Sequence, residues 1–103
     1  MTIVYLDSTK PDLAWFRFYY DSIFPEGAAH AAARYAKAID NLRNNPYIGP
    51  PIAQDGLRKL AIPKTPFSLF YRLMEDRIEI VRIWDQRGDP EKLGFHEEAA
   101  VLA

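Results

Sequence analysis

The residues of this chain that are best suited to chemistry are basic, and they gather in its second half. Between positions 58 and 72 there are four cations and no acid, and they are candidate phosphate contacts: Arg58, Lys59, Lys64 and Arg72. A solvated strand face would have the same composition. Arg87 stands apart, because it follows an expected strand and precedes the turn Gly88-Asp89-Pro90. A guanidinium there can hold a phosphate or a carboxylate, and a salt bridge to Asp85 or Asp89 is the alternative.

No familiar catalytic spacing accompanies these cations. The chain has no glycine-rich phosphate loop, no nucleophile elbow and no histidine pair at metal-binding spacing. His30 and His96 are far apart in the sequence, and each is expected on the surface. A chain end that folds back would bring His96 onto an open sheet face. We therefore expect neither a metal nor a cofactor.

Length and composition indicate one small domain over residues 1–103, with a C-terminal tail from about residue 93. Hydrophobic residues make up 49% of the chain, the net charge is −1 and there is no cysteine. This composition excludes a disordered linker and a disulfide scaffold. The near-neutral charge also argues against binding of nucleic acid through the overall field of the protein. The amino terminus has no basic leader, and no apolar run reaches the ~20 residues that cross a bilayer. We expect a cytoplasmic protein without a membrane partner.

A strand and two helices are expected in the first half of the chain. Thr2 to Asp7 has strand composition, and Pro11 and Asp12 suit the first turn of a following helix. The apolar residues of that helix form a core stripe, which is Leu13, Phe16, Tyr20 and Ile23, and a second stripe, which is Trp15, Phe18 and Tyr19. Pro25 opens a second helix, whose apolar face is Ala28, Ala32, Tyr35, Ile39 and Leu42. These helices are predicted to form an antiparallel hairpin.

Three strands are expected after Gly56: Leu57 to Ile62, Phe67 to Met74 and Arg77 to Asp85. A two-residue turn at Glu75-Asp76 pairs Arg72 with Glu79, Phe70 with Val81 and Ser68 with Ile83 on one face, which is expected to be open. The other face carries the pairs Leu73 with Ile78, Tyr71 with Ile80, Leu69 with Arg82 and Phe67 with Trp84, and it is expected to meet the helices. Arg82 does not suit that face, and a bulge would turn it out. The order β-α-α-β-β-β predicts an α+β domain with a helical hairpin on one face of a mostly antiparallel four-stranded sheet.

Three runs of the sequence carry a resemblance to a known family. They are Gly56 to Leu60, Phe67 to Arg72 and Glu75 to Pro90, and Leu42 followed by Pro46 and Gly49 adds a helix-ending element. These runs resemble the RelE/ParE superfamily of toxins from bacterial type II toxin–antitoxin (plasmid stabilisation) modules. The resemblance covers roughly residues 2–92, and the predicted order of elements is also the family's order.

The resemblance implies one of two activities. ParE-like members bind and inhibit DNA gyrase, whereas RelE-like members cut mRNA on the ribosome with basic residues and a late Tyr or His. The nuclease pattern transfers poorly, because Ser68 stands where an arginine is typical and no tyrosine follows Tyr71. Its candidates here are Arg72 and Arg87 on phosphate and His96 as acid or base. A ParE-like gyrase inhibitor is favoured; the alternatives are a RelE-like mRNA endoribonuclease and a toxin-fold protein with another target or little toxicity.

The resemblance also implies a cognate antitoxin, whose C-terminal segment wraps over the toxin in a hetero-oligomeric complex. The stripe of Trp15, Phe18 and Tyr19 is the predicted docking surface, because a contiguous exposed apolar patch usually marks a partner site. The acidic residues of the antitoxin are expected to meet three cations, Arg58, Lys59 and Arg72. The alternative is that the C-terminal tail covers the stripe with Phe95, Val101 and Leu102.

Overall fold

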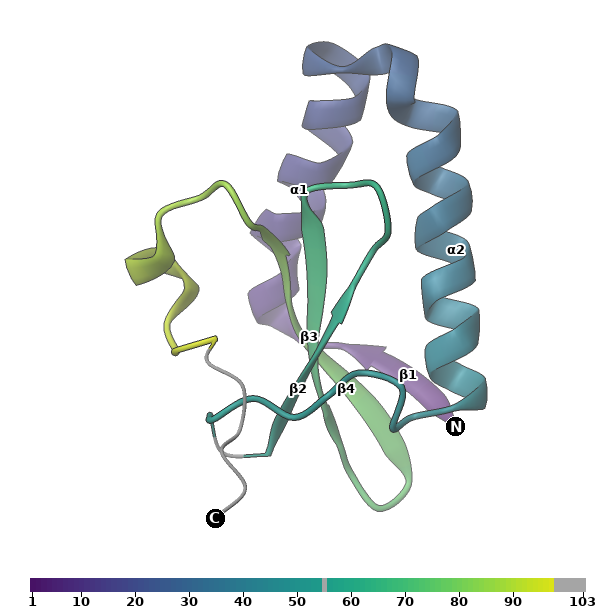
Figure 1. Ribbon diagram of the computed structural model, residues 1–103, viewed down its shortest axis with the longest axis vertical. Coiled ribbons are helices and arrows are strands. Elements are labelled where there is room, and N and C mark those ends of the chain that lie inside the picture. The colour runs from purple at the N-terminus through teal and green to yellow at the C-terminus, as the bar shows by residue number, and fades with distance from the viewer. Residues whose placement is uncertain (55, 98–103) are drawn as a thin grey trace.

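Two helices pack on one face of a four-stranded sheet (Figure 1). The computed structural model describes residues 1–54 and 56–97. The main elements are β1 (Thr2–Tyr5), α1 (Lys10–Phe18), α2 (Ala28–Asn44), β2 (Leu57–Ala61), β3 (Phe67–Leu73) and β4 (Arg77–Asp85). The sheet order is β1-β4-β3-β2, with β1 parallel to β4 and the other pairs antiparallel. The predicted order of elements and the α+β class are confirmed, and the sheet is mixed because of β1.

The first helix does not end as an α-helix. Residues Tyr19–Ile23 form a π-helical turn in which the N–H of Phe24 donates to the carbonyl of Tyr19, five residues back. A π turn holds more residues than an α turn, so the side chains after it point in new directions. Tyr20 is buried, but Ile23 is 53% exposed, and the prediction that it faces the core is wrong.

The second helix uses its alanines to approach the sheet. Its buried side chains are Ala31, Ala38, Ile39 and Leu42, with Ala28 and Tyr35 half-buried beside them. The spacing is helical, as predicted, but Ala32 is exposed because it lies at the flank of this stripe. Pro25 begins the three-residue turn Pro25–Gly27 that leads into α2, and the helix ends at Asn44.

The β3–β4 hairpin contains a bulge that changes its register. Three predicted pairs next to the turn are confirmed: Arg72 with Glu79, Tyr71 with Ile80 and Leu73 with Ile78. Beyond them the ladder skips Val81, so that Phe70 lies opposite Arg82 and the pairs predicted further along are wrong. Those pairs are Phe70 with Val81, Ser68 with Ile83, Leu69 with Arg82 and Phe67 with Trp84. The extra residue moves Ile83 to the helix side and turns Arg82 and Trp84 to the opposite face.

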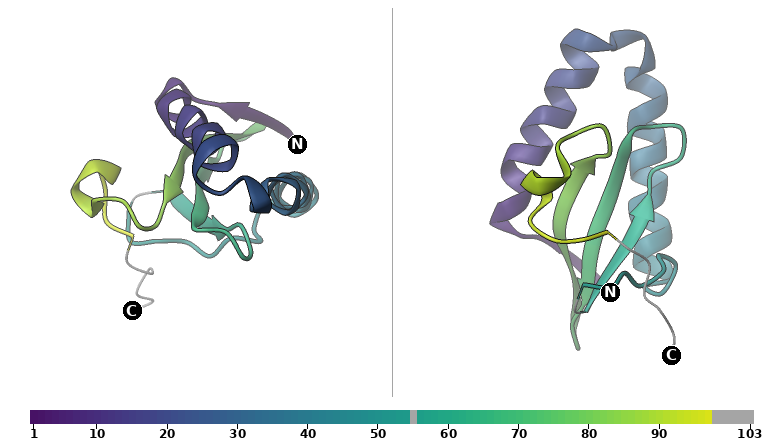
Figure 2. Two further views of the ribbon diagram at one scale, coloured as in Figure 1. Left: turned by 90° about the horizontal axis from the view of Figure 1, so that it is seen from above. Right: turned by 60° about the vertical axis from the view of Figure 1, so that its left-hand side comes forward.

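The face of the sheet opposite the helices is covered, not open as predicted. Residues 90–97, which include the short helix η4 (Pro90–Leu93), cross this face (Figure 2, right). Leu93 is buried there, and the ring of Phe95 packs against Phe70 with 5.1 Å between centroids. A second apolar core results, formed by Ile52, Leu57, Phe70, Trp84 and Leu93. Phe95 therefore does not cover the stripe on α1, while Val101 and Leu102 lie outside the described residues.

Candidate functional site

Side chains of the first helical segment line the edge of β4 where β1 ends. The ladder between β1 and β4 stops at Ile80, and beyond it Ser8 Oγ donates to the carbonyl of Val81 at 2.6 Å. The N–H of Ile83 donates to Asp12 Oδ2 at 2.9 Å. The edge of the strand thus finds hydrogen-bond partners without a further strand, and α1 is fixed in register against β4.

Asp12 and Arg82 form an ion pair at this junction. The Nε and Nη2 atoms of Arg82 donate to the two carboxylate oxygens of Asp12 at 2.8 and 2.9 Å. Its Nη1 donates to the carbonyls of Lys92 and Leu93, so that one guanidinium joins α1, β4 and the C-terminal segment. The pKa of Arg82 is raised, chiefly by the hydrogen bonds to Asp12. A bulge near Arg82 was predicted from the sequence, but Asp12 was not identified as the partner of Arg82. The sequence signal for this ion pair is an arginine within an apolar strand, because such an arginine needs an acidic partner.

The stripe of Trp15, Phe18 and Tyr19, here called the aromatic surface, lies on α1 and at the start of the π turn, beside the end of β4. Trp15 is 39% exposed and Phe18 is 52% exposed, and their rings stack with centroids 5.8 Å apart. Tyr19 is half-buried, because it also packs on the helix-side core. A hollow of about 660 Å³ runs from Trp15 and Tyr19 to Trp84 and the turn after β4. The exposed patch predicted on α1 is therefore present at Trp15 and Phe18, and the π turn extends it with Ile23 and Phe24.

Arg87 and Asp85 form the polar border of this surface. Arg87 donates to both carboxylate oxygens of Asp85 at 2.9 Å, and its guanidinium lies 4.5 Å from the ring centre of Tyr19. Trp15 Nε1 donates to Asp85 at 2.9 Å. Burial raises the pKa of Asp85, but the hydrogen bonds from Arg87 and Trp15 outweigh it and hold that pKa below its usual value. Of the two roles open to Arg87, the structure contains the salt bridge to Asp85.

The other candidate cations lie on β2, on β3 and in the turn between these strands, away from the aromatic surface. Arg58 stacks on Tyr47 and donates to the carbonyl of Gly49, and Lys59 pairs with Glu97 at 2.8 Å. Arg72 pairs with Glu79 at 2.6 Å, while Lys64 is exposed in the turn between β2 and β3. Arg58, Lys59 and Arg72 therefore do not border the aromatic surface, and an antitoxin that met both would have to reach across the sheet. The physical reason is the sheet order, which places β4 beside α1 and β2 at the far edge.

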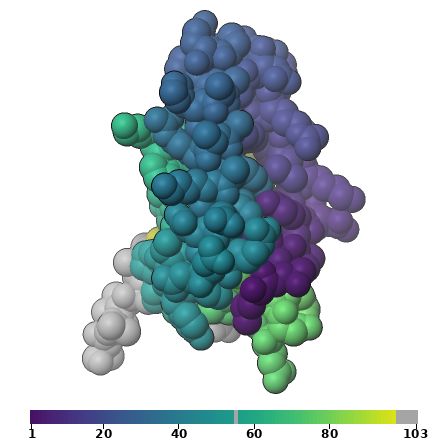
Figure 3. Space-filling view, turned by 90° about the vertical axis from the view of Figure 1, so that its right-hand side faces the viewer, coloured from purple at the N-terminus to yellow at the C-terminus, as the bar shows by residue number. Residues whose placement is uncertain are grey.

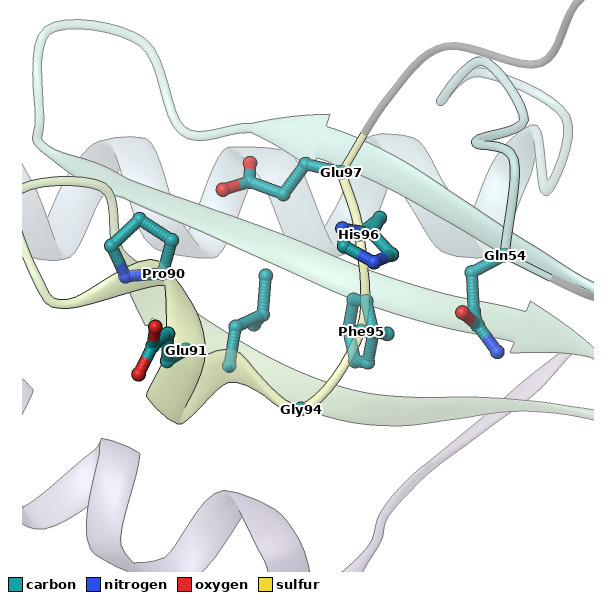
Figure 4. A pocket seen from close by; sticks show the side chains of 8 residues that line it. Gln54, Pro90, Glu91, Gly94, Phe95, His96 and Glu97 are labelled. Carbon is teal, nitrogen blue, oxygen red and sulfur yellow. The ribbon is translucent and has the colours of Figure 1, made fainter.

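The three candidates for nuclease chemistry do not converge. Arg72 lies five pairs along the ladder from the end of β4 that precedes Arg87, about 17 Å of strand. His96 is exposed on the C-terminal segment and lines a different hollow of about 610 Å³, with Glu97 beside it and Gln54 on the loop before β2 (Figure 4). Arg72 and Arg87 are both held by carboxylates. Among the described residues, no group of three or more acids and histidines is placed to hold a metal ion.

A helical hairpin on one face of a mixed four-stranded sheet agrees with the toxin fold that the sequence resembles. The chain belongs to the family described as "ParE toxin of type II toxin-antitoxin system, parDE", whose pattern matches residues 4–90. It is similar to a solved structure titled "Chromosomal ParDE TA system from P. aeruginosa", with 29% sequence identity and a TM-score of 0.63. The match covers 81% of this chain and 92% of the other. No curated protein matches the sequence significantly.

The helices of the described residues leave no candidate for a membrane span, since none is both long and apolar enough.

Proposed function

We propose that this ParE-family protein arrests growth by binding DNA gyrase and that a cognate antitoxin neutralises it. The observation that carries a binding function is the dispersal of the cations. A ribonuclease that stabilises a dianionic phosphorane needs several converging positive groups. Here Arg72, Arg87 and His96 occupy three separate places, and the two arginines are already paired with acids. The RelE-like ribonuclease is therefore the less favoured interpretation.

The gyrase proposal is tested with purified components. Purified protein added in excess to gyrase is expected to stop supercoiling of relaxed plasmid and to produce DNA cleavage complexes. Full supercoiling activity at every protein concentration would remove gyrase as the target. Primer extension on mRNA after induction in cells tests the other branch, because new 5′ ends that disappear in His96→Ala would establish cleavage instead.

The aromatic surface is the proposed docking site of the antitoxin. Trp15 and Phe18 present two stacked rings to solvent, and Ile23 and Phe24 continue the apolar area. Large aromatic side chains bordered by charged groups are typical anchors of protein interfaces. An amphipathic segment of the antitoxin fits this surface, with its apolar side on the rings and a polar side chain at the Arg87–Asp85 pair.

Replacing Trp15 by alanine should weaken antitoxin binding by about 30-fold or more, because a central aromatic anchor is lost. Phe18→Ala should act in the same direction, and titration calorimetry with the purified antitoxin measures both. Tyr47→Ala is the matched control, since Tyr47 is a more exposed aromatic residue on another part of the surface. Circular dichroism melts confirm that the variants are folded. Unchanged antitoxin affinity in both Trp15→Ala and Phe18→Ala would place the docking site elsewhere.

A further inference from the structure

A small groove lies between α2 and the outer strand β2, at the edge of the sheet remote from the aromatic surface. Figure 3 shows this side of the molecule, with α2 across it and the green β2–β3 turn projecting beside the helix. The groove has a volume of about 230 Å³ and an apolar floor that includes Ala38, Ile48 and Leu60. This volume is below the roughly 300–1,000 Å³ of small-molecule sites, and it suits one or two aliphatic side chains. The small side chain of Ala38 leaves the space open.

The rim of this groove is positively charged. Arg34 and Lys37 are three residues apart on α2, so both side chains lie on the helix face that borders the groove. No acidic residue is among the described residues that line it. Asp40, the nearest acid along α2, pairs with Arg43 instead. Within the described part of the chain neither Arg34 nor Lys37 has an ion-pair partner, and their charge favours an acidic ligand.

The backbone of β2 adds a third feature. Residues 50–52 cover the start of its outer edge, where Ile52 N–H donates to Leu57 and Lys59 N–H donates to Pro50. At Ala61, which also lines the groove, no backbone hydrogen bond covers the outer edge in residues 1–54 and 56–97. An uncovered strand edge beside an apolar hollow is suited to an extended peptide, which can satisfy the backbone groups while one side chain fills the hollow.

We infer that this groove binds an extended acidic segment of a partner protein. The segment lies along β2 at Ala61, places an aliphatic side chain over Ala38 and Leu60, and sets its carboxylates against Arg34 and Lys37. The apolar floor favours a peptide over a nucleic acid, whose phosphates would need the cations but not the hollow. This inference does not rest on gyrase being the target, and the groove is separate from the aromatic surface.

The probe is a short capped peptide that alternates glutamate and leucine, added to the ¹⁵N-labelled full chain and followed by NMR. We expect shifts of the amides around Lys37 and Ala61, with millimolar or slightly better affinity, and no shift of the Trp15 indole. The same peptide with lysine in place of glutamate should leave these amides unmoved. Shifts confined to Trp15 and its neighbours, or no shifts at millimolar peptide, would overturn the inference.

Two charge reversals on one helix complete the test. Lys37 is exposed, so Lys37→Glu leaves the core intact. This variant should weaken binding of the acidic peptide by about tenfold, because an attraction becomes a repulsion. Arg43→Glu lies on α2 outside the groove and should change the affinity less than about twofold. Equal losses in both variants would mean a diffuse charge effect and no site. Larger amide shifts with a short oligothymidine than with the peptide would mean that Arg34 and Lys37 bind phosphate, and this result would also overturn the proposal.

Discussion

Replacing Asp12 by alanine should lower the free energy of unfolding by about 3–5 kcal/mol. The side chains of Asp12 and Arg82 are only 8% and 18% exposed, so removal of the carboxylate leaves a desolvated guanidinium without its partner. The same change takes the acceptor from the buried N–H of Ile83. At roughly 4–8 °C per kcal/mol for a chain of this size, the melting temperature should fall by more than about 12 °C. Denaturant titration and thermal melts at neutral pH measure both quantities.

Three further variants separate the ion pair from other causes. Asp21→Ala removes an exposed acid from the same helical segment and should change stability by less than about 0.5 kcal/mol. Asp12→Asn keeps an acceptor for Ile83 but loses the charge, so its cost should lie between those of the other two. Asp12→Ala combined with Arg82→Met should be less destabilised than Asp12→Ala alone, because no unpaired charge remains. A single variant Asp12→Ala as stable as Asp21→Ala would contradict the role assigned to this pair.

The parts of the fold that follow from local patterns could be predicted from the sequence. The order of elements is set by turn residues and by the change from helical to strand periodicity, and the near half of the β3–β4 register follows from the two-residue turn at Glu75-Asp76. The exposure of the Trp15 and Phe18 rings could also be predicted, because α1 carries more aromatic residues than one buried face can hold.

Two wrong predictions, the core position of Ile23 and the far half of the β3–β4 register, come from single-residue insertions in regular elements. The bulge at Val81 and the π turn over Tyr19–Ile23 each add a residue, and each rotates everything beyond it. Periodicity alone cannot locate such an insertion, because the hydrophobic residues on both sides of it still alternate. The polar residues give a better signal, because Arg82 within an apolar strand requires an acid and Asp12 at the start of α1 supplies it.

The same contacts explain why the candidate site favours binding. Arg72, Arg82 and Arg87 each have a carboxylate partner within 2.9 Å, and the C-terminal segment closes the face that a RelE-like nuclease would use. Among the features that the described surface leaves free are the apolar and aromatic side chains on α1 and the cations beside a small hollow on α2. Both features are suited to a protein partner, in agreement with the proposed binding function.

Gly49 follows the second helix in the loop that covers β2, and its position allows no side chain. A Cβ atom there would lie 2.6 Å from the carbonyl oxygen of Lys59 and 2.8 Å from the hydroxyl of Tyr71. That hydroxyl is buried, accepts a hydrogen bond from the N–H of Gly49 at 2.9 Å and donates to the carbonyl of Pro46 at 2.8 Å. A phenol is protonated at neutral pH, so it can make both bonds, and burial raises the pKa of Tyr71 further above its ordinary value.

Gly49→Ala should therefore cost about 3 kcal/mol, the upper part of the range for overpacking, because the atoms that must move are a sheet carbonyl and a buried hydroxyl. Gly94→Ala is the informative control: its φ of +92° strains any side chain, but nothing lies within 4 Å of its Cβ. The control should cost only about 1–2 kcal/mol.

Tyr71→Phe should cost about 1–3 kcal/mol by leaving the N–H of Gly49 and the carbonyl of Pro46 without a partner. The double variant of Gly49→Ala and Tyr71→Phe should be less unstable than the sum of the two, since one clash and one hydrogen bond involve the same hydroxyl. Strict additivity in urea titrations would show that the loop moves away from Tyr71 without resistance, and the close packing assigned to Gly49 would then be wrong.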